Sequence, residues 1–130
     1  MLVARKSGIV GRGLFTTANI RMYQWVCEYT GRRYAPGAPL PETVNDFTYL
    51  WELSDGTVID GGDPELSNDS RHLNAACDPN CDMVEWHGRV FLFSNRRIRR
   101  GQELTIGYKI TGDKPIHRCY CGSPKCKRRF

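Results

Sequence analysis

Residues 71–81 read Arg71-His72-Leu73-Asn74-Ala75-Ala76-Cys77-Asp78-Pro79-Asn80-Cys81, and this segment is the most informative in the chain. The amide of Asn74 can both donate and accept hydrogen bonds, which suits the charged amino and carboxylate ends of an amino-acid-like ligand. The Asp78-Pro79-Asn80 portion also fits an ordinary turn-rich loop. Taken alone, the segment therefore indicates either a ligand-binding loop or a simple surface connection.

The C-terminal tail carries a second unusual pattern, with three cysteines in eight residues: Cys119, Cys121 and Cys126. Zinc prefers a tetrahedral set of four ligands, so a tail that supplies three thiolates needs one more from elsewhere. Cys77 and Cys81 are the candidates for that fourth ligand. Free thiols or a disulfide remain alternatives. If zinc is bound, it ties a remote segment to the C-terminal tail. Metal binding then contributes on the order of 10 kcal/mol to the free energy of ordering the tail.

The rest of the sequence predicts short β-strands separated by turns. We expect a glycine-punctuated hairpin at 8–15, strands at 25–29, 47–53 and 57–59, a strand–turn–strand unit at 83–93 and a final strand ending at 106. Ser67 or Asn68 is positioned to cap a short helix over 69–75. No long helical pattern alternates with the strands, so a parallel α/β sheet is not expected.

Composition fits one globular domain that carries excess positive charge. The chain has 130 residues, 40% hydrophobic and 25% charged, with a formal net charge of +5. Part of the charge lies in two clusters: Arg96, Arg97, Arg99 and Arg100, and Lys125, Lys127, Arg128 and Arg129. These clusters are either a solvated surface or a site that attracts nucleic acid or nucleosomes. We expect no membrane span and no secretory signal.

Taken together, the motifs resemble those of the SET-domain protein lysine methyltransferases, and they occur in the family's order. They are Gly11-Arg12-Gly13-Leu14-Phe15, Glu28-Tyr29-Thr30-Gly31, Tyr49-Leu50-Trp51, Ile59-Asp60-Gly61, Arg71 through Asn80, Gly101 through Tyr108, and Cys119 through Cys126. The last of these is similar to the family's post-SET zinc motif.

The resemblance implies a mostly β fold of several short sheets, with a knot-like C-terminal threading and a small zinc-bound tail. Residues 1–112 would form the SET domain and residues 113–130 the post-SET segment. The implied activity is methyl transfer from S-adenosylmethionine to a lysine side chain, with a histone tail or nucleosome as partner. The implied location is the nucleus or chromatin, or a host nucleus if the protein comes from a microbe.

Site roles also follow from the resemblance, position by position. The implied catalytic residues are Tyr108 and Tyr49. The implied cofactor-binding residues are Gly11, Arg12, Gly13, Tyr49, Asn74, Ala75 and Tyr108. Tyr49, Trp51 and Ile106 would line the lysine channel, and Cys77, Cys119, Cys121 and Cys126 would bind zinc.

The chain also departs from the family pattern. Ala75 replaces the signature histidine, Gly107 replaces the aspartate before the catalytic tyrosine, and the region between Gly31 and Tyr49 is short. Two alternatives follow: a catalytically dead domain that binds basic tails, and a zinc-stabilised nucleic-acid-binding module. We expect Cys27 in the core and packing roles for Trp25, Trp51 and Trp86. His72, His87 and His117 lack partners at metal-ligand spacing and are expected to be surface or satisfied polar residues.

Overall fold

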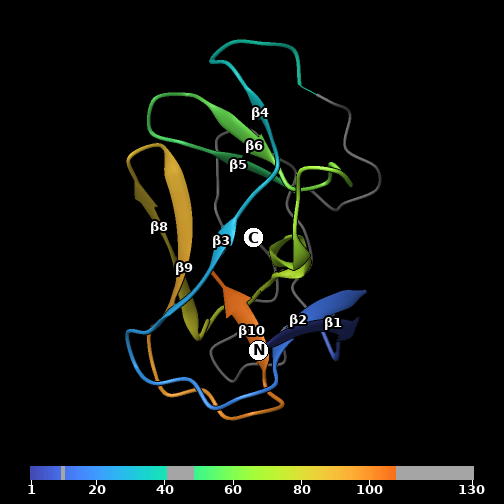
Figure 1. The fold of residues 1–130 in the computed structure, drawn as a ribbon, viewed down its shortest axis with the longest axis vertical. Helices are drawn as coiled ribbons and strands as arrows, with labels where there is room; N and C mark the ends of the chain where they lie inside the picture. Colours follow the sequence, from blue (N-terminus) through green and yellow to red (C-terminus); the bar gives the residue numbers. More distant parts are fainter. Residues whose placement is uncertain (10, 41–48, 108–130) are drawn as a thin grey trace.

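The computed structural model describes residues 1–9, 11–40 and 49–107 (Figure 1). The described chain is mostly β, as predicted. Its elements are β1 (Leu2–Lys6), β2 (Arg12–Thr16), β3 (Trp25–Tyr29), β4 (Arg32–Tyr34), β5 (Leu50–Glu52), β6 (Val58–Asp60), the 3-10 helix η1 (Asp69–His72), β7 (Asn74–Ala75), β8 (Cys81–Trp86), β9 (Arg89–Ser94) and β10 (Glu103–Ile106). No helix in these ranges is long and apolar enough to cross a membrane.

The sheet that positions the candidate site has the order β1-β2-β10-β7. β1 and β2 form an antiparallel hairpin, and β10 pairs antiparallel with β2, so that Leu104 faces Leu14 across the ladder. On its other edge β10 pairs in parallel with β7, matching Thr105 to Asn74 and Ile106 to Ala75. The last described strand therefore joins the N-terminal glycine segment to the 71–81 segment.

A second sheet, β3-β9-β8, closes over the main core. Its inward side chains join those of the first sheet in one cluster: Leu14, Ile20, Val26, Cys81, Leu92, Ile98 and Leu104. Cys27 packs against this cluster, and burial raises the pKa of its thiol to about 12, so its predicted core role is confirmed. Trp25 and Trp86, in contrast, are 52% and 60% exposed. Their predicted packing role was wrong, because both residues lie on the outer face of this sheet.

The third sheet, β4-β6-β5, packs around a smaller core of Tyr29, Leu53, Ile59 and Val90. Gly31 lies between β3 and β4, where its backbone approaches the backbone at the end of β6. A Cβ atom on Gly31 would overlap the carbonyl oxygen of Asp60 and lie 2.5 Å from its carbonyl carbon. Only glycine allows two backbones to approach this closely, so the glycine of the Glu28–Gly31 motif has a structural cause.

The short helix forms where the sequence predicts it, but it ends earlier. Asn68 is the N-cap, and its side chain accepts a hydrogen bond from the Ser70 amide. The helix stops at His72 because Asn74 and Ala75 pair instead with β10. The predicted strand over 47–53 is shorter as described and begins at Leu50, while residues 41–48 lie outside the described ranges.

Candidate active site

The candidate site is built where the glycine segment at the start of β2 and the 71–81 segment meet β10. Asn74 donates from Nδ2 to the carbonyl oxygen of Arg12 at 3.1 Å and to Oε2 of Glu103 at 2.8 Å. Ser7 donates its hydroxyl to the same carboxylate at 2.7 Å and 2.8 Å. One carboxylate therefore joins three segments that are distant in sequence.

Gly13 makes this arrangement possible. A Cβ atom at this position would overlap Oε2 of Glu103, lie 2.7 Å from its Cδ and lie 3.1 Å from Cβ of Ser7. Any larger residue would push the carboxylate away from its two donors. Gly11, two residues earlier, has a φ of +53° and open space where a Cβ would be. The segment thus combines a left-handed turn with a backbone that a ligand can approach.

Asn80 fixes the other end of the signature segment. Its Nδ2 donates to the Glu103 carbonyl at 2.9 Å, and its Oδ1 accepts from the Thr105 amide at 2.9 Å. The side-chain amide therefore pairs with β10 as a backbone peptide group would. It holds the Asp78–Asn80 turn against the strand, and Arg96 further holds that turn by an ion pair with Asp78 at 3.1 Å.

Glu103 and Asn80 hold the candidate site together, and sequence reasoning did not single them out. Both lie inside quoted motifs, but their partners are 23 to 96 positions away. An isolated charged or amide residue in a strand or turn carries no local pattern that identifies such a partner.

The backbone of Tyr49, a predicted channel residue, is held by hydrogen bonds to Tyr29 and Gly61. Its carbonyl oxygen accepts hydrogen bonds from the Tyr29 hydroxyl and from the Gly61 amide, the latter at 3.0 Å. Burial raises the pKa of Tyr29 far above its usual value, so its hydroxyl stays a donor. The side chain of Tyr49 is 39% exposed beside Gly62, which leaves its ring accessible to a substrate.

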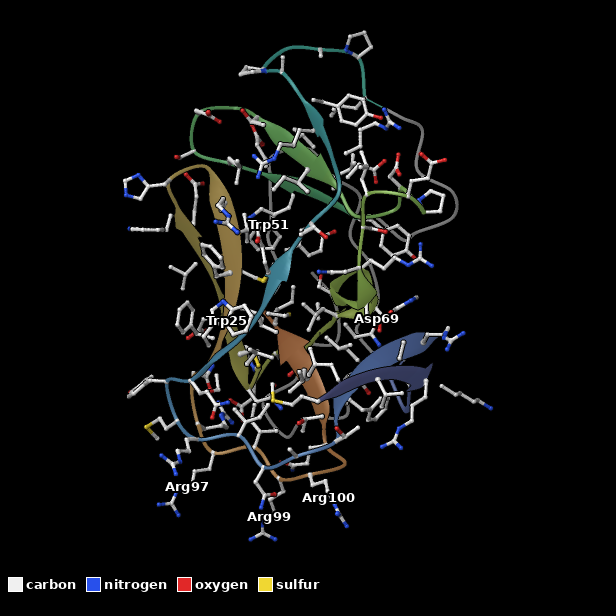
Figure 2. The ribbon with its side chains drawn as sticks, in the orientation of Figure 1. Trp25, Trp51, Asp69, Arg97, Arg99 and Arg100 are labelled. Atoms are coloured by element: carbon white, nitrogen blue, oxygen red, sulfur yellow. The ribbon has the colours of Figure 1, made fainter. Side chains whose placement is uncertain are left out.

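The other predicted channel residues border different core clusters. Trp51 packs against the smaller core, with its ring centroid 6.4 Å from that of Tyr29 (Figure 2). Ile106 packs against the main core. Met83 contacts both clusters and therefore lies between the two groups. Trp51 thus packs against one core cluster and Ile106 against the other, while Tyr49 lies beside Gly62.

The described cysteines differ in environment. Cys81 is fully buried in the main core, and burial raises the pKa of its thiol to about 12. Cys77 is half-buried in the turn that follows β7 and belongs to neither core cluster.

Tyr108, Cys119, Cys121 and Cys126 lie outside the described residues, so their predicted roles stay predictions. Within residues 1–9, 11–40 and 49–107, no group of three or more His, Cys, Asp or Glu side chains could hold a metal.

The two described histidines each contact the side chain that precedes them in the sequence. His72 accepts a hydrogen bond from Arg71 at 3.3 Å, and burial together with the charges of Arg71 and Arg12 lowers its pKa. His87 is exposed and stacks edge-on against Trp86, with ring centroids 4.1 Å apart. Both residues fit the structural role predicted for them.

Comparison with known proteins identifies the family. The family model of the SET domain matches residues 11–109. Histone-lysine N-methyltransferase 2B of Homo sapiens is 32% identical over 136 residues, covering 95% of this chain and 5% of the relative. Histone-lysine N-methyltransferase trithorax of Drosophila melanogaster is 30% identical over 138 residues, covering 95% of this chain and 4% of the relative. The chain thus spans a small part of these relatives.

A solved structure gives the same result at the level of the fold. The crystal structure of KRYPTONITE in complex with mCHG DNA and SAH matches with a TM-score of 0.80 and 27% identity, covering 98% of this chain and 28% of that chain. The strand order around β10, the glycine segment and the signature segment are therefore parts of a known architecture. The chain belongs to the SET-domain family.

Proposed function

We propose that the protein is a protein-lysine N-methyltransferase that uses S-adenosylmethionine and acts on a histone. The observation that carries the proposal is the junction at Glu103, where the glycine segment and Asn74 are fixed on one strand. Two of the similar proteins named above are histone-lysine methyltransferases, and the matching solved structure contains SAH. A histone substrate implies a location in the nucleus or on chromatin.

The residues at the junction fit an amino-acid-like cofactor. Gly11 leaves open space at a turn of the backbone, and the Arg12 carbonyl lies beside a carboxylate and an amide. These groups suit the ammonium and carboxylate of a methionine-like end. The backbone of Ala75, next along the chain, would contact the rest of the cofactor, which needs no histidine side chain. When bound, S-adenosylmethionine supplies an electrophilic methyl group.

The chain's own residues would orient the lysine and keep its amine neutral. Tyr49 and Trp51 would form one wall of the channel, Ile106 another, and Tyr108 would direct its hydroxyl to the reaction centre. A poorly solvated channel disfavours the ammonium form and lowers the pKa of the amine. Correct alignment of amine and methyl group then supplies much of the rate enhancement, because the reaction is a direct displacement.

Asn74→Ala tests the cofactor site. Removing the amide deletes one hydrogen bond to the Arg12 carbonyl and one to the Glu103 carboxylate, which keeps only the Ser7 hydroxyl as its described side-chain donor, and this disturbs the junction. We expect the affinity for S-adenosylmethionine to fall by about 1–3 kcal/mol, which is roughly 5- to 150-fold. Isothermal calorimetry measures the change, and Asn19→Ala, which removes an exposed asparagine on another loop, is the control. An unchanged dissociation constant, or no binding by the wild type, would contradict the assignment.

We also propose one structural zinc ion, bound by Cys77, Cys119, Cys121 and Cys126. Asn80 and Arg96 fix the turn that carries Cys77 at the edge of the core. Cys81 is a poor alternative, because its sulfur is enclosed by apolar side chains. Four thiolates would close the coordination shell of the ion and leave it without an open position for catalysis.

Elemental analysis of purified protein tests this ligand set. We expect one zinc per chain in the wild type and in Cys81→Ser, and loss of zinc in Cys77→Ser. The reason is that three remaining thiolates bind zinc much more weakly than four. Retention of zinc by Cys77→Ser together with its loss from Cys81→Ser would move the fourth ligand to Cys81. Absence of stoichiometric metal from the wild type would contradict the site altogether.

A further inference from the structure

Two loops at one end of the molecule form a ribbon whose exposed arginines make no ion pair with any described residue. The β2–β3 and β9–β10 loops meet at a single antiparallel bridge, where Ile20 and Ile98 exchange both backbone hydrogen bonds at 2.8 Å and 3.0 Å. Both isoleucines are buried in the main core. Residues next to the bridge therefore point the opposite way, toward solvent.

Continuing the antiparallel register of this bridge by one step would bring Arg21 opposite Arg97. Both of these side chains are exposed. Arg99 flanks the bridge on its other side. Like charges directly opposite on neighbouring strands destabilise a fold. The fold gains nothing from this placement, so the charges point to a role in binding.

Of the neighbouring arginines, one forms an ion pair with another described residue and four do not. In the part of the chain that the structure describes, the ion pairs are Arg32–Asp63, Arg89–Glu28 and Arg96–Asp78. Arg96 is thus held by the fold, whereas Arg21, Arg97, Arg99 and Arg100 make none of these pairs. The side chains of Arg97, Arg99 and Arg100 extend away from the lower end of the molecule (Figure 2).

Backbone hydrogen bonds shape the ribbon, and one of its two loops exposes an aromatic side chain. The Gln102 amide donates to the Arg99 carbonyl at 3.1 Å, and Gly101 has a φ of +91°. Residues 99–102 therefore form a tight turn that projects Arg100. Tyr23, in the facing loop, has a φ of 60° and is 75% exposed. A tyrosine in a left-handed conformation costs free energy, and an exposed ring recovers little of that cost by packing.

From these observations we infer that the ribbon of Arg21, Tyr23, Arg97, Arg99 and Arg100 binds the phosphate backbone of duplex DNA. Arginine forks match phosphate oxygens in charge and geometry, and a tyrosine hydroxyl donates to the same groups. The surface presents several exposed cations together, which suits a long polyanion. This inference does not depend on methyl transfer, and it gives the domain a way to orient itself on nucleosomal DNA.

Salt dependence and paired variants of the full chain test the inference, with a short mixed-sequence DNA duplex as the probe. Four phosphate contacts predict a slope of about −3.6 in a plot of log affinity against log salt, or roughly a 150-fold loss for a fourfold rise in salt. Arg97→Gln with Arg99→Gln should weaken binding at least about tenfold and reduce the slope to about −1.8. The control, Arg32→Gln with Arg33→Gln, removes the same charge from β4 at the opposite end and should bind as the wild type does (Figure 1).

A charge reversal separates binding from stability. Arg97→Glu replaces a repulsive pair with an attractive one across from Arg21, so the unfolding midpoint should rise while DNA affinity falls. Equal DNA affinity in the ribbon and control variants would overturn the inference. It would also be overturned if the ribbon variants lost affinity only for polyglutamate, because that result would assign the surface to an acidic protein.

Discussion

Gly31→Ala is expected to destabilise the protein by about 3 kcal/mol. The new Cβ would overlap the carbonyl oxygen of Asp60 and lie 2.9 Å from the amide nitrogen of Gly61. Both contacts are with backbone atoms of β6 and the turn after it, so no flexible side chain can move aside. The third sheet must therefore shift relative to β3.

Chemical denaturation followed by circular dichroism measures this loss. Gly8→Ala is the matched control, because no atom lies within 4 Å of the Cβ position there and its φ is not in the left-handed region. That variant should be neutral or slightly stabilised, since alanine restricts the unfolded chain. If the two alanine variants unfold at the same denaturant concentration, the backbone of Gly31 does not lie as close to Asp60 as described.

Tyr108→Phe is expected to reduce methyl transfer by about tenfold or more while the fold and cofactor affinity stay nearly unchanged. Only a hydroxyl is removed, so packing is preserved. The hydroxyl would orient the amine and stabilise charge in the transition state. Single-turnover kinetics with labelled S-adenosylmethionine measures the rate, and calorimetry measures the affinity. Full activity in this variant would remove Tyr108 from the catalytic assignment.

Tyr34→Phe is a suitable control for that experiment. Tyr34 is the last residue of β4, and the same hydroxyl is lost there. Its methyl-transfer rate should match that of the wild type. A comparable loss in both variants would indicate a general effect of tyrosine replacement.

The sequence predicted the elements that carry apolar patterns or clear turn signals. The strand at Trp25–Tyr29 has the predicted bounds, and the capped helix begins at Asp69 as expected from Asn68. β1 and β4 were not predicted, because β1 ends in two basic residues, β4 begins with two, and neither strand alternates apolar and polar residues. Their pairing with β2 and β6 forms them, and that pairing is a long-range property.

Motif order indicated the family, but not the contacts that assemble the site. The Gly-x-Gly motif was visible, whereas the reason for Gly13 is a carboxylate that lies 90 positions later in the chain. Asn80 likewise pairs with β10 through a side chain that mimics a peptide group. Such contacts depend on the packed fold. The exposure of Trp25 and Trp86 was missed for the same reason, since sequence alone does not say which face of a sheet is covered.

Mass spectrometry of core histones and reconstituted nucleosomes incubated with the protein and S-adenosylmethionine tests the central claim most directly. The proposed function predicts methyl groups on lysine side chains in the presence of the wild-type protein. It predicts that these modifications are largely lost with Tyr108→Phe and are absent without the cofactor. Unmodified histone lysines after reaction with zinc-loaded protein that binds the cofactor would contradict the assignment as a histone methyltransferase.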